Sequence, residues 1–444
     1  MSGARSRRSY EVFRPTRIGP IEIPNRWVRS ATADIAPSRL GRFTEQDIAR
    51  YRALAESGIG LILVGGAEVL PAAAAEMDSL RDWTLSIDEV RIEGTRDLIR
   101  AMRDAAADCV IVAQLECNAL VSGAKPAGPS PIRSPFFDGR FRALDVVEIE
   151  RIVEAFVRSI LHAKEEGFDG VQLHAAHGGG LWHFLSPYAN RRDDRYGGSV
   201  GNRVRIVHEI VDRVRAAATD FPILIKVNCD DYLEDGIDRD EFQALAVALE
   251  AAGIDAIEVS GGTWDCLVRT EEELGFRPVP AAESRTRILE PEQQAYFLSY
   301  VEGLDLGIPI ILVGGVRNVE RAEEIVRSGS ADLVAMCRPL IREPDLVARW
   351  RAGRGPADAA CIACNSCIYS MYLPFERLGR RTVTCLAAHD AALHAEAQRW
   401  LTTFVDEIRV DGAACPEFDD PEERMNGAVE RSRERGTGES RKLP

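Results

Sequence analysis

Two histidines lie three residues apart just after an apolar segment of strand length. The segment covers residues 168–174 and ends at His174, and His177 follows it. Two imidazoles at such a place can bind a metal ion or donate hydrogen bonds to a substrate oxygen, whereas a single histidine is more often a structural residue. Since the metal alternative lacks a third ligand nearby in the sequence, the pattern favours hydrogen bonding to a substrate oxygen.

A lysine and two glycines with an arginine mark further candidate positions. Lys226 leaves an apolar segment whose neighbours indicate that it points inward, where a cation could stabilise negative charge on a reduced ring system. Gly314 and Gly315 follow a second apolar segment, and Arg338 follows a third. Paired glycines let backbone N–H groups approach an anion and an arginine can clamp it, so these loops predict a phosphate site. The alternative for the glycine pair is a tight turn between strand and helix.

Four cysteines are grouped near the end of the chain. Cys361, Cys364 and Cys367 occur at every third position, and Cys385 follows them. Three thiolates at this spacing can hold one corner of a [4Fe–4S] cluster, with a distant fourth completing it. A zinc ion bound by four thiolates and a group of reduced thiols without metal are the alternatives. The spacing alone does not separate the three.

Apolar segments of strand length alternate with helical patterns along most of the chain. Most of the segments are continuous, as in strands buried on both faces of a parallel sheet. The expected helices carry apolar residues at intervals of three and four, and glycine follows most of them. The expected strands are 27–32, 59–64, 109–115, 168–174, 223–228, 254–260, 308–313 and 331–336, and examples of the expected helices are 45–56, 148–166, 202–218, 239–252 and 319–328.

This alternation predicts an α/β protein with a (β/α)8 TIM barrel over residues 10–355. An open doubly wound sheet would not explain eight repeats as simply. Barrel enzymes place their chemistry on the loops after the strands, which is where the candidate residues lie. A Cys-rich extension is expected over residues 356–390, followed over 391–444 by a helical segment at 391–408 and a charged tail expected to be disordered.

Composition and charge limit the partners and the compartment. The chain has 444 residues, of which 45% are hydrophobic and 28% charged, and 55 basic against 70 acidic residues give a net charge of −15. Global disorder is thereby excluded, and nucleic acid or an anionic membrane is not expected as a partner. Arg7 and Arg8 resemble a twin-arginine signal, but no apolar region follows them. With no apolar stretch of about 18 residues either, a cytoplasmic protein is predicted.

Longer motifs in the same order resemble the old yellow enzyme family of FMN-dependent oxidoreductases. The resemblance covers about residues 10–385, and the Cys-rich segment is similar to the branch of that family that includes trimethylamine dehydrogenase and dienoyl-CoA reductase. The motifs are GFDGVQLHAAH at 167–177, FLSP at 184–187, NRR at 190–192, Asp194, YGGS at 196–199, Asn25-Arg26, the turn at 41–44, QL at 114–115, IK at 225–226, VSGG at 259–262, VGG at 313–315 and RP at 338–339.

The resemblance implies an FMN site with defined residues. Ser30, Ala31 and Thr32 would line the flavin, with Gly66 beside it, Gln114 at its pyrimidine edge, Lys226 near N1 and O2, and Gly314, Gly315, Cys337 and Arg338 around the 5′-phosphate. His174 and His177 match the pair that hydrogen-bonds the activating oxygen of the substrate. Cys361, Cys364, Cys367 and Cys385 would hold the cluster, although no dinucleotide-binding fingerprint follows them.

Three positions depart from the family pattern. Gly179 stands where the family usually has a tyrosine that delivers a proton to the α carbon of the substrate, so ene reduction here needs another acid. Ala33 replaces the threonine or cysteine of relatives, which excludes a cysteinyl-linked flavin there. The stretch after Gln114 reads LECNAL, without the usual histidine, so an unusual substrate pocket is expected.

These features together predict an FMN-dependent oxidoreductase. NAD(P)H would reduce FMN, and hydride would pass to the β carbon of a small electron-poor substrate such as an α,β-unsaturated carbonyl, which the two histidines polarise. One alternative is an FMN/[4Fe–4S] dehydrogenase whose electrons leave to a partner protein. Another is a flavin-binding or metal-stabilised interaction protein without turnover. A homo-oligomer is expected, because relatives commonly form dimers or larger assemblies.

Overall fold

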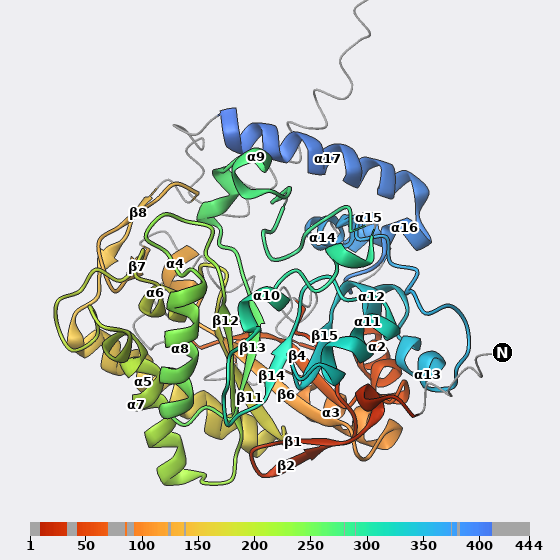
Figure 1. Ribbon diagram of the computed structural model, residues 1–444, viewed down its shortest axis with the longest axis horizontal. Helices are drawn as coiled ribbons and strands as arrows, with labels where there is room; N and C mark the ends of the chain where they lie inside the picture. Colours follow the sequence, from red (N-terminus) through yellow and green to blue (C-terminus); the bar gives the residue numbers. More distant parts are fainter. Residues whose placement is uncertain are drawn as a thin grey trace, which may run out of the picture.

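Eight parallel strands close into a barrel in the computed structural model of the chain (Figure 1). The structure describes residues 9–32, 42–69, 85–86, 93–122, 126–136, 139–278, 280–288, 290–373, 375–379 and 382–410. The barrel strands are β3 (Trp27–Arg29), β4 (Leu61–Glu68), β6 (Val110–Glu116), β11 (Gly170–Ala175), β12 (Ile223–Asn228), β13 (Ala256–Ser260), β14 (Ile310–Leu312) and β15 (Leu333–Met336). The pairing of β3 with both β15 and β4 closes the ring, so the predicted (β/α)8 barrel is confirmed.

Helices surround the strands, and their ends carry the expected capping residues. Thr44 and Asp145 each form a capping box with the residue three positions on, and Gly167 ends α5 in the left-handed conformation. The longer helices are α2 (Glu45–Glu56), α3 (Thr95–Ala105), α5 (Val146–Glu166), α7 (Val200–Ala217), α8 (Arg239–Ala251), α11 (Val319–Arg327) and α17 (Ala391–Val410). The expected helices are therefore confirmed to within two residues at each end.

Short elements complete the described chain. The short helices are α4 (Ala119–Ser122), α6 (Gly180–Leu185), α9 (Glu271–Leu274), α10 (Leu298–Val301), α12 (Arg338–Arg342), α13 (Leu346–Arg351), α14 (Ser366–Tyr372), α15 (Phe375–Leu378) and α16 (Leu386–His389), with 3-10 turns η2 (Glu11–Phe13), η4 (Asp265–Val268) and η5 (Pro291–Gln293). The short strands are β1 (Thr16–Ile18), β2 (Ile21–Ile23), β5 (Leu85–Ser86), β7 (Ala127–Gly128), β8 (Arg133–Ser134), β9 (Gly139–Arg140) and β10 (Arg142–Ala143).

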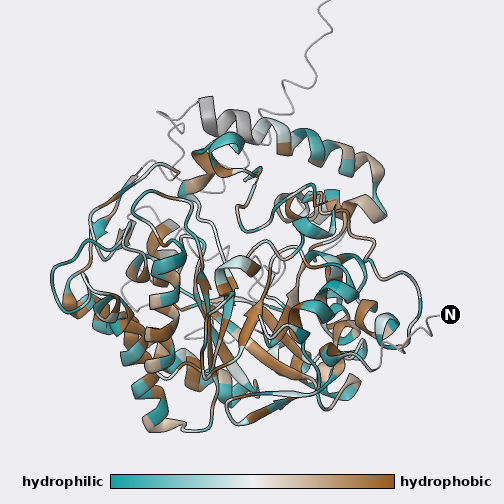
Figure 2. Ribbon diagram, viewed as in Figure 1, coloured by the Kyte–Doolittle hydropathy of each residue, from teal (hydrophilic) through white to brown (hydrophobic). Residues whose placement is uncertain are grey.

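The barrel interior is apolar at one end and polar at the other. Alternate side chains such as Val112, Leu224 and Ala256 form a buried cluster that the β1–β2 hairpin covers through Ile18 and Ile23. The side chains between them point outward and pack against the helices in the largest cluster. Figure 2 shows the same separation, with hydrophobic residues along the strands and hydrophilic residues on the outer faces of the helices. The inward side chains nearer the carboxyl end of each strand lie outside this apolar cluster, so they can be polar.

The C-terminal segment packs around a small core of its own. Tyr369, Leu373, Leu386, Trp400 and their neighbours form a separate buried cluster, and α17 contacts α14, α16 and η4 (Figure 1). The helix expected over residues 391–408 is thus present as α17. The charged tail after it, like Ala33 and Gly41, lies outside the described residues.

None of the helices in the described ranges is long and apolar enough to span a membrane.

The start of α6 depends on a close approach that only glycine allows. A Cβ atom on Gly180 would overlap the carbonyl oxygen of Cys117, whereas one on Gly201, in α7, would have nothing within 4 Å. We expect Gly180→Ala to lower the free energy of unfolding by about 1–3 kcal/mol, because backbone atoms must shift. Gly201→Ala is the matched control and should change it by less than about 1 kcal/mol. Urea unfolding of both variants measures the difference, and equal stabilities would contradict the packing argument.

Candidate active site

The carboxyl ends of the barrel strands surround one large cavity of about 340 Å³. All twelve residues predicted to bind the cofactor or the substrate line this cavity. They are Ser30, Ala31, Thr32, Gly66, Gln114, His174, His177, Lys226, Gly314, Gly315, Cys337 and Arg338. Residues far apart in the sequence are therefore brought to the rim where barrel enzymes place their chemistry.

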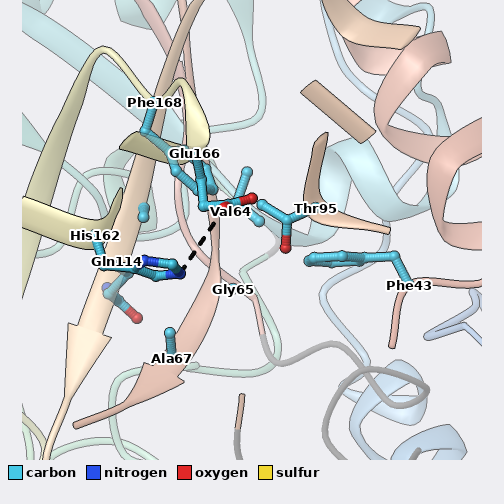
Figure 3. Close-up of a pocket in the computed structure, with 10 residues that line it drawn as sticks. Phe43, Val64, Gly65, Ala67, Thr95, Gln114, His162, Glu166 and Phe168 are labelled. Atoms are coloured by element: carbon cyan, nitrogen blue, oxygen red, sulfur yellow. Dashed lines mark ion pairs between the residues drawn. The ribbon is translucent and has the colours of Figure 1, made fainter. Parts of the chain in front are cut away.

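A second cavity lies on the outer side of β4 and β6 (Figure 3). It measures about 20 Å³, room for about one water molecule. His162 and Glu166 border it together with apolar side chains, and His162 Nε2 lies 3.9 Å from Glu166 Oε1. This space is too small for a substrate.

A buried polar network forms the floor of the large cavity. Lys226 Nζ lies 3.1 Å from Glu258 Oε1 and donates a hydrogen bond to Ser30 Oγ at 3.0 Å. Ser30 Oγ donates to Glu258 Oε1 at 2.6 Å, and Gln172 Nε2 donates to Glu258 Oε2 at 2.7 Å. Gln114 Nε2 in turn donates to Gln172 Oε1 at 2.7 Å. The Lys226 ammonium is thus paired with the carboxylate of Glu258, a residue that is 0% exposed.

Sequence reasoning missed Glu258 and Gln172 in this network. A signal was present, because each is a polar residue inside an otherwise apolar strand. Glu258 lies two positions after Ala256, which belongs to the cluster inside the barrel, and alternate residues of a strand share a face. The alternation therefore indicates that both side chains point into the barrel.

The two histidines contact each other across the end of β11. His174 Nε2 lies 3.2 Å from His177 Nδ1, and His177 Nε2 lies 2.7 Å from Ser260 Oγ. Asn228 Oδ1 accepts a hydrogen bond from the backbone N–H of His177, which has a φ of +60°. Burial, with the charge of Lys226 adding to it, lowers the pKa of His174 to about 3, and burial also lowers that of His177. Both rings are neutral at pH 7, and in the described residues His174 Nδ1 has no hydrogen-bond partner.

The predicted phosphate residues line the same cavity after β14 and β15. Gly314 and Gly315 have φ values of +125° and +76°, which favour glycine. Arg338 Nη1 donates hydrogen bonds to the carbonyl oxygen of Arg285 and to Asn365 Oδ1. Cys337 Sγ lies 2.8 Å from Thr32 Oγ1.

The arrangement of donors and charges fits FMN. Neutral imidazoles and a buried ammonium line the cavity from the ends of β11 and β12, and two left-handed glycines with a guanidinium line it from the ends of β14 and β15. A planar ring with a phosphate tail needs this division, with donors for ring oxygens at one end and anion-binding groups at the other. The unpaired ring nitrogen of His174 adds a buried polar atom that a bound molecule can satisfy.

Among the described residues, the four cysteines are not assembled into a metal site. Cys361 and Cys367 line the cavity, whereas Cys364 Sγ donates to Ser366 Oγ at 3.6 Å and Cys385 Sγ accepts from Arg342 Nη1 at 3.8 Å. Burial raises the pKa of Cys361 and of Cys367. Within the described ranges no three Cys, His, Asp or Glu side chains are grouped closely enough to hold a metal ion. No chemical step below therefore passes through a [4Fe–4S] cluster or zinc.

Comparison with known proteins decides the family. Residues 11–356 match the model of the NADH:flavin oxidoreductase / NADH oxidase family. The chain belongs to this family. The predicted family is thereby confirmed, and its name places the chain among flavin-linked oxidoreductases, the predicted enzyme class.

Individual members of the NADH:flavin oxidoreductase / NADH oxidase family resemble the chain over most of its length. An NADH oxidase of Thermoanaerobacter brockii is 32% identical over 80% of this chain and 52% of its own. A 4,4'-dithiodibutanoate disulfide reductase of Rhodococcus erythropolis is 30% identical over 87% of this chain and 97% of its own. The chain spans about half the length of several curated relatives that it matches.

Solved structures support the same fold. A 2-naphthoyl-CoA reductase in complex with 2-naphthoyl-CoA superimposes with a TM-score of 0.71 and 22% identity over 88% of this chain and 58% of its own. At that identity the likeness shows the fold of the family and no more.

Proposed function

We propose that the protein is an FMN-dependent oxidoreductase that takes hydride from NADH or NADPH and delivers it to a small electron-poor molecule such as an α,β-unsaturated carbonyl. The observation that carries this proposal is the meeting of all ten predicted FMN residues and both histidines in one cavity. Family membership over residues 11–356 supports it independently. The proposal also includes a homo-oligomer in the cytoplasm.

The cofactor supplies the hydride chemistry when it is bound. The chain's own residues hold and polarise the substrate. His174 and His177 are neutral because their pKa values are depressed by burial. Each ring therefore carries one N–H, which can donate to a carbonyl oxygen once the hydrogen bonds that join the two rings and His177 to Ser260 are exchanged for it. These donors stabilise the negative charge that develops on that oxygen. Lys226, held by Glu258, keeps a positive charge on the cavity floor.

A second candidate function is oxidation of a donor substrate with transfer of electrons to a partner protein. Cys361 and Cys367 favour it, because these two thiols of the Cys-rich segment line the same cavity as the predicted FMN residues. Gly179 also favours it, because oxidation needs no proton donor at that position.

Anaerobic stopped-flow measurements on the FMN-loaded protein separate these functions. We expect NADH or NADPH to bleach the flavin absorbance within seconds, and 2-cyclohexenone to restore it. Bleaching by an amine or alcohol donor alone would instead support the dehydrogenase. Failure of every donor would contradict both and leave a flavin-binding protein without turnover, and a colourless chain that refuses added FMN would remove the cofactor assignment itself.

A further inference from the structure

Reduction of an activated double bond needs an acid that the residues discussed so far do not provide. Hydride adds to one carbon, and a proton must add to the other. Gly179 has no side chain, and the two histidines are neutral rings that hydrogen-bond to each other. The proton must therefore come from water or from an ionisable acid on the cavity wall.

Glu116 carries a carboxyl group on the cavity wall, at the same height along the barrel as His174. It ends β6, and Gln172 pairs with Gln114 and Leu173 with Leu115 in the register of β11 with β6. One step further along, Glu116 lies beside His174, and alternation puts its side chain on the same inward face as Gln114. Both Glu116 and His174 line the cavity.

The carboxyl group of Glu116 reaches across to β4. A Cβ atom built on Gly66 would lie 2.5 Å from Glu116 Oε1, so glycine at this position makes room for the carboxyl. Gly66 is also one of the residues predicted to lie beside the flavin. The acid is thus directed to the part of the cavity where the ring and a substrate above it would meet.

Asn118 holds Glu116 on the side of Gly179. Its Nδ2 donates to Glu116 Oε2 at 2.9 Å, and its backbone N–H donates to Glu68 Oε2 at 3.0 Å. A Cβ atom on Gly179 would lie only 2.6 Å from Asn118 Oδ1. The space that a side chain at position 179 would need is therefore filled by the residue that holds the acid.

We propose that the Glu116 carboxylic acid delivers the proton to the α carbon of the substrate. This assignment rests on the proposed function. The π bond breaks as hydride that originates from a reduced nicotinamide forms a C–H bond at the β carbon, and the proton of Glu116 forms a C–H bond at the α carbon. Glu116 remains as a carboxylate and takes a new proton from water.

The protonation state of Glu116 suits this task. Burial raises its pKa to about 7, against the opposing effect of the hydrogen bond from Asn118. The ionisable groups nearest to it are Glu68 on β4, Cys117 next to it, His174 on β11 and Lys226 on β12, whose charge is paired with Glu258. A substantial fraction is therefore protonated at neutral pH, and the acid form is lost as the pH rises above 7.

The test compares Glu116→Gln with wild type in separate half-reactions. We expect bleaching by NADH to change less than about twofold, and reoxidation by 2-cyclohexenone to slow by about 100-fold or more. Reoxidation by ferricyanide, which takes electrons without protonation of carbon, should be unchanged. The wild-type rate with the enone should fall as the pH rises above about 7, and the variant should lose this dependence. Glu56→Gln, which removes an exposed carboxylate paired with Arg52, is the matched control.

A measurement that needs no turnover completes the test. Infrared difference spectra of the flavin-free protein should show a protonated carboxyl band that titrates near pH 7 in wild type and in Glu56→Gln and is lost in Glu116→Gln. The band of Asp231, whose pKa burial raises to about 6, should be the same in all three proteins. Glu116→Asp retains an acid, so it should keep the pH dependence at a reduced rate, and FMN content and thermal unfolding report whether each variant folds.

Each outcome bears on a defined part of the proposal. Enone rates in Glu116→Gln equal to wild type, or a band near pH 7 with the same amplitude in that variant as in wild type, would overturn the assignment of Glu116 while leaving the proposed function intact. Wild-type protein that NADH reduces and no enone reoxidises would overturn the proposed function and the assignment together.

Discussion

Lys226→Met is expected to lower the free energy of unfolding by about 3–5 kcal/mol, because it leaves the Glu258 carboxylate buried without its cation. Glu258 is 0% exposed. After the substitution its remaining partners among the described residues are Ser30 and Gln172, which donate hydrogen bonds to it. Methionine is unbranched like lysine, is only one heavy atom shorter and adds no charge. The loss therefore reports the uncompensated charge rather than a cavity.

A double variant separates the ion pair from packing. In Lys226→Met/Glu258→Gln the buried charge is gone and an amide can still accept from Gln172, so we expect most of the lost stability to return. Urea unfolding of the flavin-free proteins at pH 7 gives the three free energies. Lys164→Met removes an exposed lysine elsewhere and serves as the control. Equal losses in the single and the double variant would contradict the ion-pair argument.

The stable double variant, which loses the Lys226 cation together with the Glu258 carboxylate, then tests the effect of this ion pair on the flavin. A cation on the cavity floor favours the anionic reduced ring. Its removal should lower the reduction potential of bound FMN, which a spectroscopic redox titration measures. An unchanged potential would place Lys226 away from the ring.

The barrel was predictable because its signals are local. Continuous apolar segments with helical patterns between them need no knowledge of distant contacts. The D-x-x-E sequence at Asp145 marks the start of α5 two residues earlier than periodicity does, because it forms a capping box. β14 is shorter than the expected 308–313, and Pro309, which has no N–H for the sheet, precedes its first residue.

The composition of the site was less predictable because its contacts join distant strands. A buried lysine is expected to pair with a carboxylate. That this carboxylate is Glu258 depends on how β12 and β13 align. Asn118 contacts both Glu116 and Gly179, and the spacing of these residues in the sequence does not indicate that they meet. Cysteine spacing likewise marks metal candidates, but the positions of Cys364 and Cys385 depend on the packing of the short C-terminal helices.

Replacing both cavity histidines is expected to weaken a phenolic ligand about 100-fold while FMN stays bound. Each N–H donated to a phenolate oxygen is worth about 1.5–3 kcal/mol, and the two are not additive. The variant is His174→Ala/His177→Ala, and titration with 4-chlorophenol, followed by its long-wavelength charge-transfer absorbance, gives the dissociation constant. His208→Ala, which removes an exposed ring 3.5 Å from Asp212, should leave it unchanged. Unaltered affinity in the double variant would remove both histidines from substrate binding.

The depressed pKa values make a second distinction in the same titration. An ordinary histidine changes charge near pH 6.5, and phenolate affinity would then change as the ring lost its proton. Because burial lowers the pKa of His174 to about 3 and that of His177 as well, neither ring titrates between pH 5 and 8. Affinity in wild type should therefore follow only the ionisation of the phenol and of Glu116. In Glu116→Gln the affinity should follow the ionisation of the phenol alone. A residual change in affinity near pH 6.5 would show that the histidines are less buried than the structure indicates.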